Sequence, residues 1–319
     1  MNPPIKAESL LEVRNLSVSV SSEKETKRLI HKVSFIIRRN EVLVLLGESG
    51  SGKTVLSRSI TKLFAPTRPM ILEGSVVFEG LELSSLDELE LRPIRRKKIR
   101  YVFQDPMQSL SPVANVRTHL YHSADTRSRN DSMLKDLLKS TGLDAKQVLD
   151  LFPHQLSIGM AQRVCIAMAV LPSPSLLVAD EPTSAVDASQ RYQLIDMLIS
   201  IQRRMGMSLI FITHDLVLAR GFGTRIVVLY AGRIIESAPR EAFFKKQLHP
   251  YSRLLVNALQ TSGTIVEARS SPPLTVAAIP ERGCRFHFDC PIAREQCREA
   301  EPDLEQSAEE REVRCFFWK

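Results

Sequence analysis

The chain has 319 residues, of which 44% are hydrophobic and 25% charged, proportions typical of a globular protein rather than a disordered or fibrous one. Its 43 Lys and Arg residues exceed its 36 Asp and Glu residues, so the net charge is +7; a basic balance fits nucleic-acid or anionic-membrane partners without choosing between them. No apolar run approaches the roughly 18 residues of a membrane-spanning helix, and the opening segment MNPPIKAESLLEVRN lacks the apolar core of a secretory signal. We therefore expect a soluble protein on the cytosolic side.

Short β-rich runs alternate with helical patterns up to residue 260, which predicts an α/β core with a mostly parallel sheet. From about residue 106 to 171 the β pattern gives way to helical periodicity, in Met133–Leu138 and Ala161–Val170, and we predict an inserted helical subdomain there. The predicted strands, several of them wholly apolar as in a sheet covered on both faces, are Glu41–Leu46, Ser75–Phe78, Ile99–Phe103, Leu176–Ala179, Leu209–Thr213 and Arg225–Leu229.

The C-terminal part of the chain differs in composition from this core. Residues 261–280 are rich in Ser, Thr and Pro, as a linker is. Residues 281–319 hold most of the cysteines. The predicted organisation is therefore a main domain over residues 1–260, a linker over 261–280 and a small Cys-rich extension over 281–319.

A glycine-rich loop follows the apolar run VLVLL and precedes a helical pattern at Val55–Phe64. It matches G-x-x-x-x-G-K-[ST] in the strand–loop–helix context typical of P-loop NTPases. The glycines let backbone N–H groups surround the phosphates, and the N-terminus of the following helix adds its dipole. Lys53 places a positive charge on the β- and γ-phosphates, and the Thr54 hydroxyl is a Mg²⁺ ligand. The predicted ATP-binding residues are Gly47, Glu48, Ser49, Gly50, Ser51, Gly52, Lys53 and Thr54.

A second apolar run, LLVA, ends in the acidic pair Asp180 and Glu181. Buried carboxylates are costly, and a metal ion explains such a pair more readily than packing does. We predict that Asp180 orients Mg²⁺ and that Glu181 positions or deprotonates the attacking water. The pair therefore indicates hydrolysis of the bound nucleotide.

Between these motifs, the segment Leu156-Ser157-Ile158-Gly159-Met160 resembles the signature of ABC ATPases, in its LSGGM form with Ile158 replacing the first glycine. Other segments resemble that family's motifs in its order: Gln104 the Q-loop glutamine, Ser184–Asp187 the D-loop, and His214 the switch histidine. The resemblance implies a P-loop, RecA-like core in which Gln104 contributes to Mg²⁺ binding and, with His214, senses the γ-phosphate. Glu181, His214 and Gln104 would form the catalytic set. Ser157 and Gly159 would contact ATP across a head-to-tail pair of subunits, and Asp187 would be a further ATP-binding residue.

Four further segments extend the resemblance over nearly the whole chain: DPMQSLSP, YAGRIIESAP, LHPYSRLLVNAL and GCRFHFDCP are similar to the ATP-binding subunits of dipeptide, oligopeptide and nickel importers. This implies a peripheral ATPase on the cytoplasmic side of the inner membrane that powers uptake of peptides, nickel or a similar small solute. Its partners would be two transmembrane permease subunits, an extracytoplasmic solute-binding protein and a second ATPase subunit, which the altered signature favours as a paralogue. Nucleic acid is not an expected partner.

Two alternatives stay open. The first is a soluble ABC ATPase in nucleic-acid repair or translation, although such proteins usually carry two cassettes or a long coiled-coil insertion and this chain has neither. The second is a regulatory subunit that binds ATP and barely hydrolyses it; Ile158 favours this reading, while Glu181 and His214 speak against it. The basic run Arg92–Arg100 predicts a solvated or membrane-proximal face rather than a nucleic-acid site.

Two departures from the family pattern carry expectations. Ile158 brings a β-branched side chain to a position where phosphate closely approaches glycine, and Ile does not easily adopt a positive φ, so we predict a weakened site for the partner's ATP. The neighbourhood Leu16–Arg28, where the family places an aromatic side chain against adenine, contains none, and the adenine contact stays open.

Four of the five cysteines lie in the C-terminal extension, as Cys284, Cys290, Cys297 and Cys315. Their spacing is wider than the C-x₂-C pairs of zinc ribbons, yet four thiolates can hold zinc or an iron–sulfur cluster. The importer resemblance implies a [4Fe–4S] cluster, with zinc and four reduced, buried thiols as alternatives. His287 lies between two of these cysteines and could replace one as a ligand, although a surface role suits it better.

Overall fold

The structure, a computed structural model, describes residues 9–21, 26–64, 70–124, 130–261, 280, 282–307 and 310–319. The chain divides into two compact units. The first unit contains Ile37–Val42 and Ser85–Ile212 with the start of the chain up to Leu10. The second unit contains Leu11–Ile36, Leu43–Ser84 and Thr213–Lys319.

Three parallel strands form the sheet of the first unit: β6 (Ile99–Val102), β7 (Leu176–Asp180) and β8 (Ser208–Thr213). β7 and β8 are buried along their whole length, as their continuous apolar runs predict. The crossover from β7 to β8 passes through α7 (Ala188–Met205). Asp180 lies opposite Ile212, so β7 delivers its acidic end to the carboxyl edge of this sheet.

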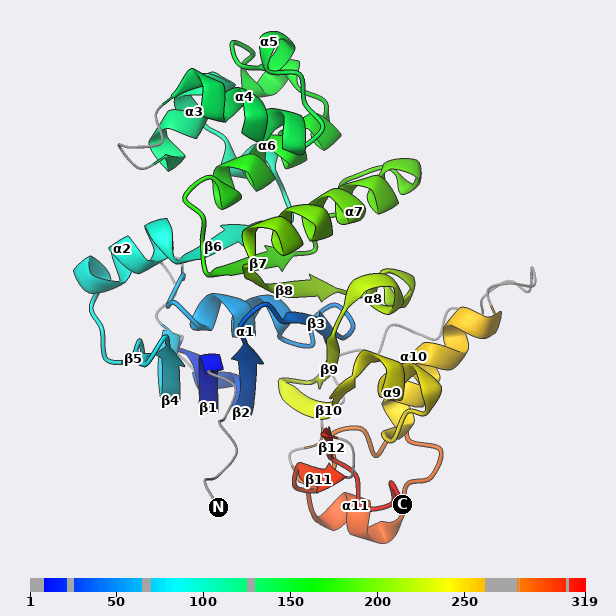
Figure 1. Cartoon of the computed structure of the whole chain (residues 1–319). Coiled ribbons are helices and arrows are strands. Elements are labelled where there is room, and N and C mark those ends of the chain that lie inside the picture. Colours follow the sequence, from blue (N-terminus) through cyan, green and yellow to red (C-terminus); the bar gives the residue numbers. More distant parts are fainter. Residues whose placement is uncertain are drawn as a thin grey trace, which may run out of the picture. The chain divides into compact units, whose positions relative to one another are not determined.

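Among the described residues between β6 and β7, four α-helices share one apolar core (green in Figure 1). The predicted helical segments Met133–Leu138 and Ala161–Val170 fall inside the second and the last of them. The helices are α3 (Val116–Ser123), α4 (Asp131–Ser140), α5 (Ala145–Val148) and α6 (Ile158–Val170), with the short 3₁₀ helices η1 (Met107–Ser109) and η3 (Pro153–Gln155). Helix α2 (Glu88–Lys97), which precedes β6, carries most of the basic run and starts with a capping box of Asp87 and Glu90.

The main sheet of the second unit is mixed. β3 (Val42–Leu46) pairs parallel with β9 (Arg225–Tyr230), which pairs antiparallel with β10 (Arg233–Pro239). β12 (Arg311–Val313) and β11 (Glu305–Ser307) extend it with further antiparallel pairs (red in Figure 1). The prediction of a mostly parallel sheet is therefore too simple: the two-residue turn of Ala231 and Gly232, with φ of 46° and 76°, folds β10 straight back onto β9.

A second, antiparallel sheet has the order β2-β1-β4-β5. Its strands are β1 (Ser9–Ser21), β2 (Thr26–Arg38), β4 (Met70–Phe78) and β5 (Leu81–Glu82). The remaining helices of the second unit are α1 (Lys53–Ser59), α8 (Leu216–Phe222), α9 (Arg240–Lys245), α10 (Pro250–Thr261) and α11 (Glu295–Glu299).

All six predicted strands are present, and their ends shift by a few residues; Ser75–Phe78 is the second half of β4. The helix after the glycine-rich loop is shorter than Val55–Phe64, because it ends at Ser59 and Lys62 turns out of the helix with φ of 52°. Of the predicted linker 261–280, residues 262–279 lie outside the described residues. Within the described ranges, none of the helices combines the length and apolarity needed to cross a membrane.

Candidate functional site

The glycine-rich loop 47–54 joins β3 to α1 inside the second unit. Gly50 and Gly52 have φ of 83° and 103°, in the left-handed region that favours glycine. A Cβ at Gly47 would collide with the carbonyl oxygen of Leu229, and one at Gly52 would lie 2.8 Å from the Cδ1 atom of Ile30. The backbone of the loop is therefore packed so closely on β9 and β2 that its turn depends on glycine, which is the arrangement needed for consecutive N–H groups to bind phosphate.

Lys53 is the first residue of α1, and its side chain is almost completely buried. Its Nζ donates hydrogen bonds to the carbonyl oxygens of Gly47 (2.7 Å) and Glu48 (2.9 Å). The ammonium group is thus held against the loop itself, and Thr54 follows it in the same turn. Burial raises the pKa of the Glu48 carboxyl group, and the charge of Lys53 opposes this shift. A cradle that excludes Cβ atoms and holds a cation fits the phosphates of a nucleotide.

The acidic pair lies at the end of β7 in the first unit. Asp180 is buried and is the last residue of the strand. Glu181 has φ of 45°, its N–H donates to the Ile212 carbonyl (3.0 Å), and its own carbonyl accepts from the Ser184 N–H (3.1 Å) and hydroxyl (2.9 Å). A non-glycine residue held at positive φ by hydrogen bonds on both sides is a conformation that often marks functional sites, and no sequence motif predicts it here.

The signature segment forms the N-terminus of α6, also in the first unit. Ser157 caps the helix by accepting a hydrogen bond from the Met160 N–H (3.2 Å). A Cβ at Gly159 would lie 2.8 Å from the Oε1 atom at the end of the flexible Gln190 side chain of α7, which can shift, so packing between the helices does not by itself require this glycine. Ile158 is 50% exposed and is not among the described residues with positive φ. The expected backbone conflict at Ile158 is therefore wrong; what is unusual there is the protruding side chain.

The remaining predicted site residues are exposed and follow strands or start helices. Gln104 comes two residues after β6, Asp187 is the N-cap of α7, and His214 follows β8 directly. The first unit therefore holds Gln104, Ser157, Gly159, Asp180, Glu181 and Asp187, whereas the loop 47–54 and His214 belong to the second unit.

Sequence reasoning missed the residues that support the loop from behind. The Gly232 N–H, in the turn between β9 and β10, donates to the carbonyl oxygen of Ser51 (2.8 Å), and the His31 N–H of β2 donates to the Gly232 carbonyl (3.0 Å). The only available signal was the run YAGR, in which Ala-Gly between two strands indicates a tight turn.

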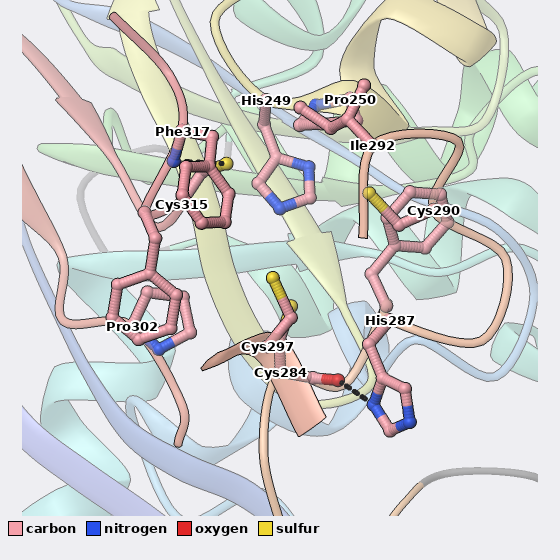
Figure 2. A pocket seen from close by; sticks show the side chains of 12 residues that line it. His249, Pro250, Cys284, His287, Cys290, Ile292, Cys297, Pro302, Cys315 and Phe317 are labelled. Carbon is pink, nitrogen blue, oxygen red and sulfur yellow. Dashed lines mark hydrogen bonds between the residues drawn. The ribbon is translucent and has the colours of Figure 1, made fainter. Parts of the chain in front are cut away.

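The four cysteines of the C-terminal extension line one pocket together with His249, His287 and Phe317 (Figure 2). Phe286 also lines this pocket. All four are free thiols, and the Cys284 N–H donates to the Cys297 carbonyl (2.7 Å). Burial and neighbouring thiols raise the pKa of Cys284 to about 11, and burial also raises the pKa values of Cys290 and Cys315. The donor set suits a group held by four thiolates. The cysteine side chains are not arranged as a metal site, because among the described residues no group of three or more His, Cys, Asp or Glu side chains is placed to hold a metal ion.

Comparisons with known proteins agree with the nucleotide motifs and extend beyond them. Residues 30–184 match the family model "ABC transporter", and residues 235–297 match "Oligopeptide/dipeptide transporter, C-terminal region". The chain is 36% identical over 318 residues to the dipeptide transport ATP-binding protein DppD of Escherichia coli, covering 97% of both chains. It is 34% identical over 321 residues to the oligopeptide transport ATP-binding protein AppD of Bacillus subtilis, covering 98% of this chain and 97% of the relative.

Solved structures show the same likeness. A dimeric ATP-binding cassette in a post-hydrolysis state, bound to ADP and Pi, matches with a TM-score of 0.63 and 29% identity. The match covers 72% of this chain and 98% of that one.

Proposed function

The chain belongs to the family of ABC transporter ATP-binding proteins of dipeptide and oligopeptide importers, and we propose that its loop 47–54 binds the phosphates of ATP while its signature helix α6 completes an ATP site on a second subunit. It is the ATP-binding subunit of such an importer and couples ATP hydrolysis to transport. The observation that carries the proposal is the glycine-dependent loop with the buried Lys53 ammonium group.

The proposed roles follow from the chemistry of each residue. Lys53 neutralises charge on the β- and γ-phosphates, and the Thr54 hydroxyl and the Asp180 carboxylate are the oxygen donors for Mg²⁺, with Gln104 adding an amide oxygen. Glu181 takes the role of orienting the attacking water and accepting its proton. His214 donates to the γ-phosphate and so distinguishes ATP from ADP. The buried position of Asp180 and the fixed backbone of Glu181 support these assignments.

The partners are proposed from the family. An ATPase of this kind works with a partner ATPase, permease subunits and a solute-binding protein. We take the chain to be peripheral to the cytoplasmic face of the membrane. Its Ser157, Gly159 and Asp187 would face the nucleotide on the loop of the other ATPase, since the N-terminus of α6 offers backbone N–H groups to an anion. A paralogue is the proposed partner, because Ile158 would make the two ATP sites unequal.

Two substitutions test the function. Lys53→Ala should abolish ATP binding by the full-length chain on its own and abolish peptide uptake in the assembled importer; intact binding and uptake would exclude the loop as the nucleotide site. Glu181→Gln should keep ATP affinity and lower the rate of hydrolysis at the site on this chain's own loop by about 10²- to 10⁴-fold, the contribution of a general base. Hydrolysis equal to that of the wild type would instead favour a regulatory subunit that binds ATP without significant turnover.

We further propose that the Cys-rich extension binds a [4Fe–4S] cluster through Cys284, Cys290, Cys297 and Cys315. Support comes from their common pocket and from the absence of disulfides among them. Iron and acid-labile sulfide should be present after anaerobic purification and lost in Cys297→Ser. The matched control is Cys165→Ser, because Cys165 is buried in α6, outside the pocket. A colourless protein with one zinc ion per chain would assign zinc instead, and a protein free of both metals would assign four thiols.

A further inference from the structure

The turn between β9 and β10 is the support on which the phosphate loop rests. Gly232 holds Ser51 through its N–H and β2 through its carbonyl, at 2.8 and 3.0 Å. Its φ is 76°, and a Cβ there would collide with the Leu29 carbonyl oxygen. The turn, β2 and the loop are therefore joined backbone to backbone, so a shift of the turn moves the carbonyl of Ser51 in the middle of the loop.

A residue of the C-terminal extension fixes this turn from the other side. One terminal nitrogen of Arg285 donates to the Ala231 carbonyl (2.6 Å), and the other lies 3.0 Å from Nδ1 of His31. The side chain of Arg285 is only 15% exposed. Glu301 pairs with it at 3.6 Å and also with Arg233 at 2.6 Å. The guanidinium group thus bridges the β9–β10 turn and β2, the same two elements that Gly232 joins.

The next residue reinforces the contact. Phe286 is fully buried and packs edge-on against Tyr230, with ring centroids 5.4 Å apart, and against Tyr251 at the same separation. Tyr230 ends β9 and precedes Ala231, so two successive residues of the extension hold the last residue of β9 and the first residue of the turn. Such aromatic pairs add packing energy beyond the area that they bury.

We propose that Arg285 is a positioning residue for ATP: it fixes the β9–β10 turn, and the turn holds Ser51 so that the phosphate loop keeps its phosphate-binding shape. The proposal deepens the function proposed above and rests on it. It also gives the C-terminal extension a task at the nucleotide site, since Arg285 follows Cys284 of the cysteine pocket directly.

The proposal predicts a specific kinetic pattern. Arg285→Ala removes both charged hydrogen bonds, and we expect the Kd for a fluorescent ATP analogue on the full-length chain to rise about tenfold, or ~1.4 kcal/mol. In the assembled importer the KM for ATP should rise by a similar factor while kcat at saturating ATP stays close to the wild-type value, because Arg285 orders the loop and takes no part in hydrolysis. Arg285→Lys keeps a donor for the Ala231 carbonyl and should give an intermediate Kd.

A matched control is Arg294→Ala, which removes an arginine of the same extension whose guanidinium lies over Phe317, 4.2 Å from the ring centroid, and not against the turn. It should leave the Kd unchanged. The proposal is overturned if Arg285→Ala binds the analogue as the wild type does, or if Arg294→Ala loses as much affinity, which would indicate general damage to the extension. Lys53→Ala separates the proposed ATP-binding function from the positioning role of Arg285. If Lys53→Ala loses binding while Arg285→Ala does not, only the positioning role fails.

Discussion

Ile158 occupies the first position of α6, directly after the capping Ser157, and half of its surface is exposed. Because its backbone is not at positive φ, the helix N-terminus keeps its shape, and the Ser157 cap is intact. Any weakening of the partner's ATP site must then come from the bulk of the side chain between the helix and the phosphate. Steric crowding of this kind costs about 1–3 kcal/mol in packed sites.

Removing that bulk should therefore strengthen the site. We expect Ile158→Gly and Ile158→Ala to raise the ATPase turnover of the assembled importer by a similar factor. Relief of a crowding energy of about 1–3 kcal/mol corresponds to about fivefold or more, because ~1.4 kcal/mol is tenfold. The measurement is steady-state ATP hydrolysis at saturating ATP. A rise with Gly alone would show that backbone freedom matters after all, and unchanged turnover in both variants would remove Ile158 as the cause of a weak site.

His31 provides a pH dependence at the residue scale. Burial, with the charges of Arg285 and Arg233, lowers the pKa of His31 from 6.5 to about 4. In the unfolded chain His31 therefore binds a proton below pH 6.5, whereas in the folded chain His31 stays neutral until about pH 4. The stability that depends on neutral His31 is complete above pH 6.5 and is lost as the pH falls towards 4.

The substitution His31→Asn tests this window, because the amide oxygen can still accept from Arg285 but does not titrate. Thermal unfolding of the full-length chain at pH 7 and pH 5 should show a smaller loss of melting temperature in His31→Asn than in the wild type. The exposed His154, changed to Asn, serves as the control and should keep the wild-type loss. Equal losses in all three proteins would contradict the role of His31.

The placement of the candidate nucleotide-site residues in the fold was predictable to the extent that it is local. The loop glycines, Lys53 and the acidic pair follow from motifs whose spacing is set by the ligand. The positive φ of Glu181 and the contact of Arg285 with Ala231 were not predictable, since each depends on a partner distant in the sequence. A single sequence carries no record of such pairs.

At the scale of elements, burial on both faces made β7, β8 and β9 easy to predict. β1 and β2 were missed although each has 13 residues, because polar and apolar side chains mix along them and their burial is partial. The antiparallel return of β10 was missed because the parallel expectation comes from α/β alternation, while Ala231 and Gly232 form the turn of a hairpin.

A buried ion pair joins β10 to β12. Glu236 is completely buried, accepts from the N–H groups of Leu248 and His249 at 2.9 Å each, and pairs with Arg311 at 3.1 Å. Removing one partner of such a pair leaves an uncompensated buried charge and costs about 3–5 kcal/mol. Arg311→Ala should therefore strongly destabilise the attachment of the C-terminal extension.

Urea denaturation followed through the fluorescence of Trp318, the single tryptophan and itself part of the extension, measures this effect locally. The control is Arg28→Ala, which removes a more exposed pair with Glu73 (3.1 Å) and should cost at most about 1 kcal/mol. A double variant, Glu236→Gln with Arg311→Met, should recover part of the loss because it buries no lone charge. If Arg311→Ala and Arg28→Ala lower the free energy of unfolding by the same amount, the ion pair of Glu236 and Arg311 does not hold the C-terminal extension in place.

At the scale of the whole molecule, the proposed function has each chain contribute different groups to two ATP sites. Its loop 47–54 belongs to one proposed site, and its Ser157 and Gly159 to the other. In a heterodimer with a paralogue, the loop of this chain and the signature of the partner ATPase then form one functional unit, and substitutions within a unit are not additive.

The energetic consequence can be measured with pairs of variants in the assembled importer. Lys53→Ala and a signature-serine substitution in the partner ATPase disable the same site, so combining them should lower ATP hydrolysis no further than Lys53→Ala alone. Lys53→Ala combined with Ser157→Arg in this chain disables both sites, because the arginine side chain blocks the N-terminus of α6, and hydrolysis should fall to background. Additive losses in the first pair would mean that each chain hydrolyses ATP on its own, without a signature supplied by its neighbour.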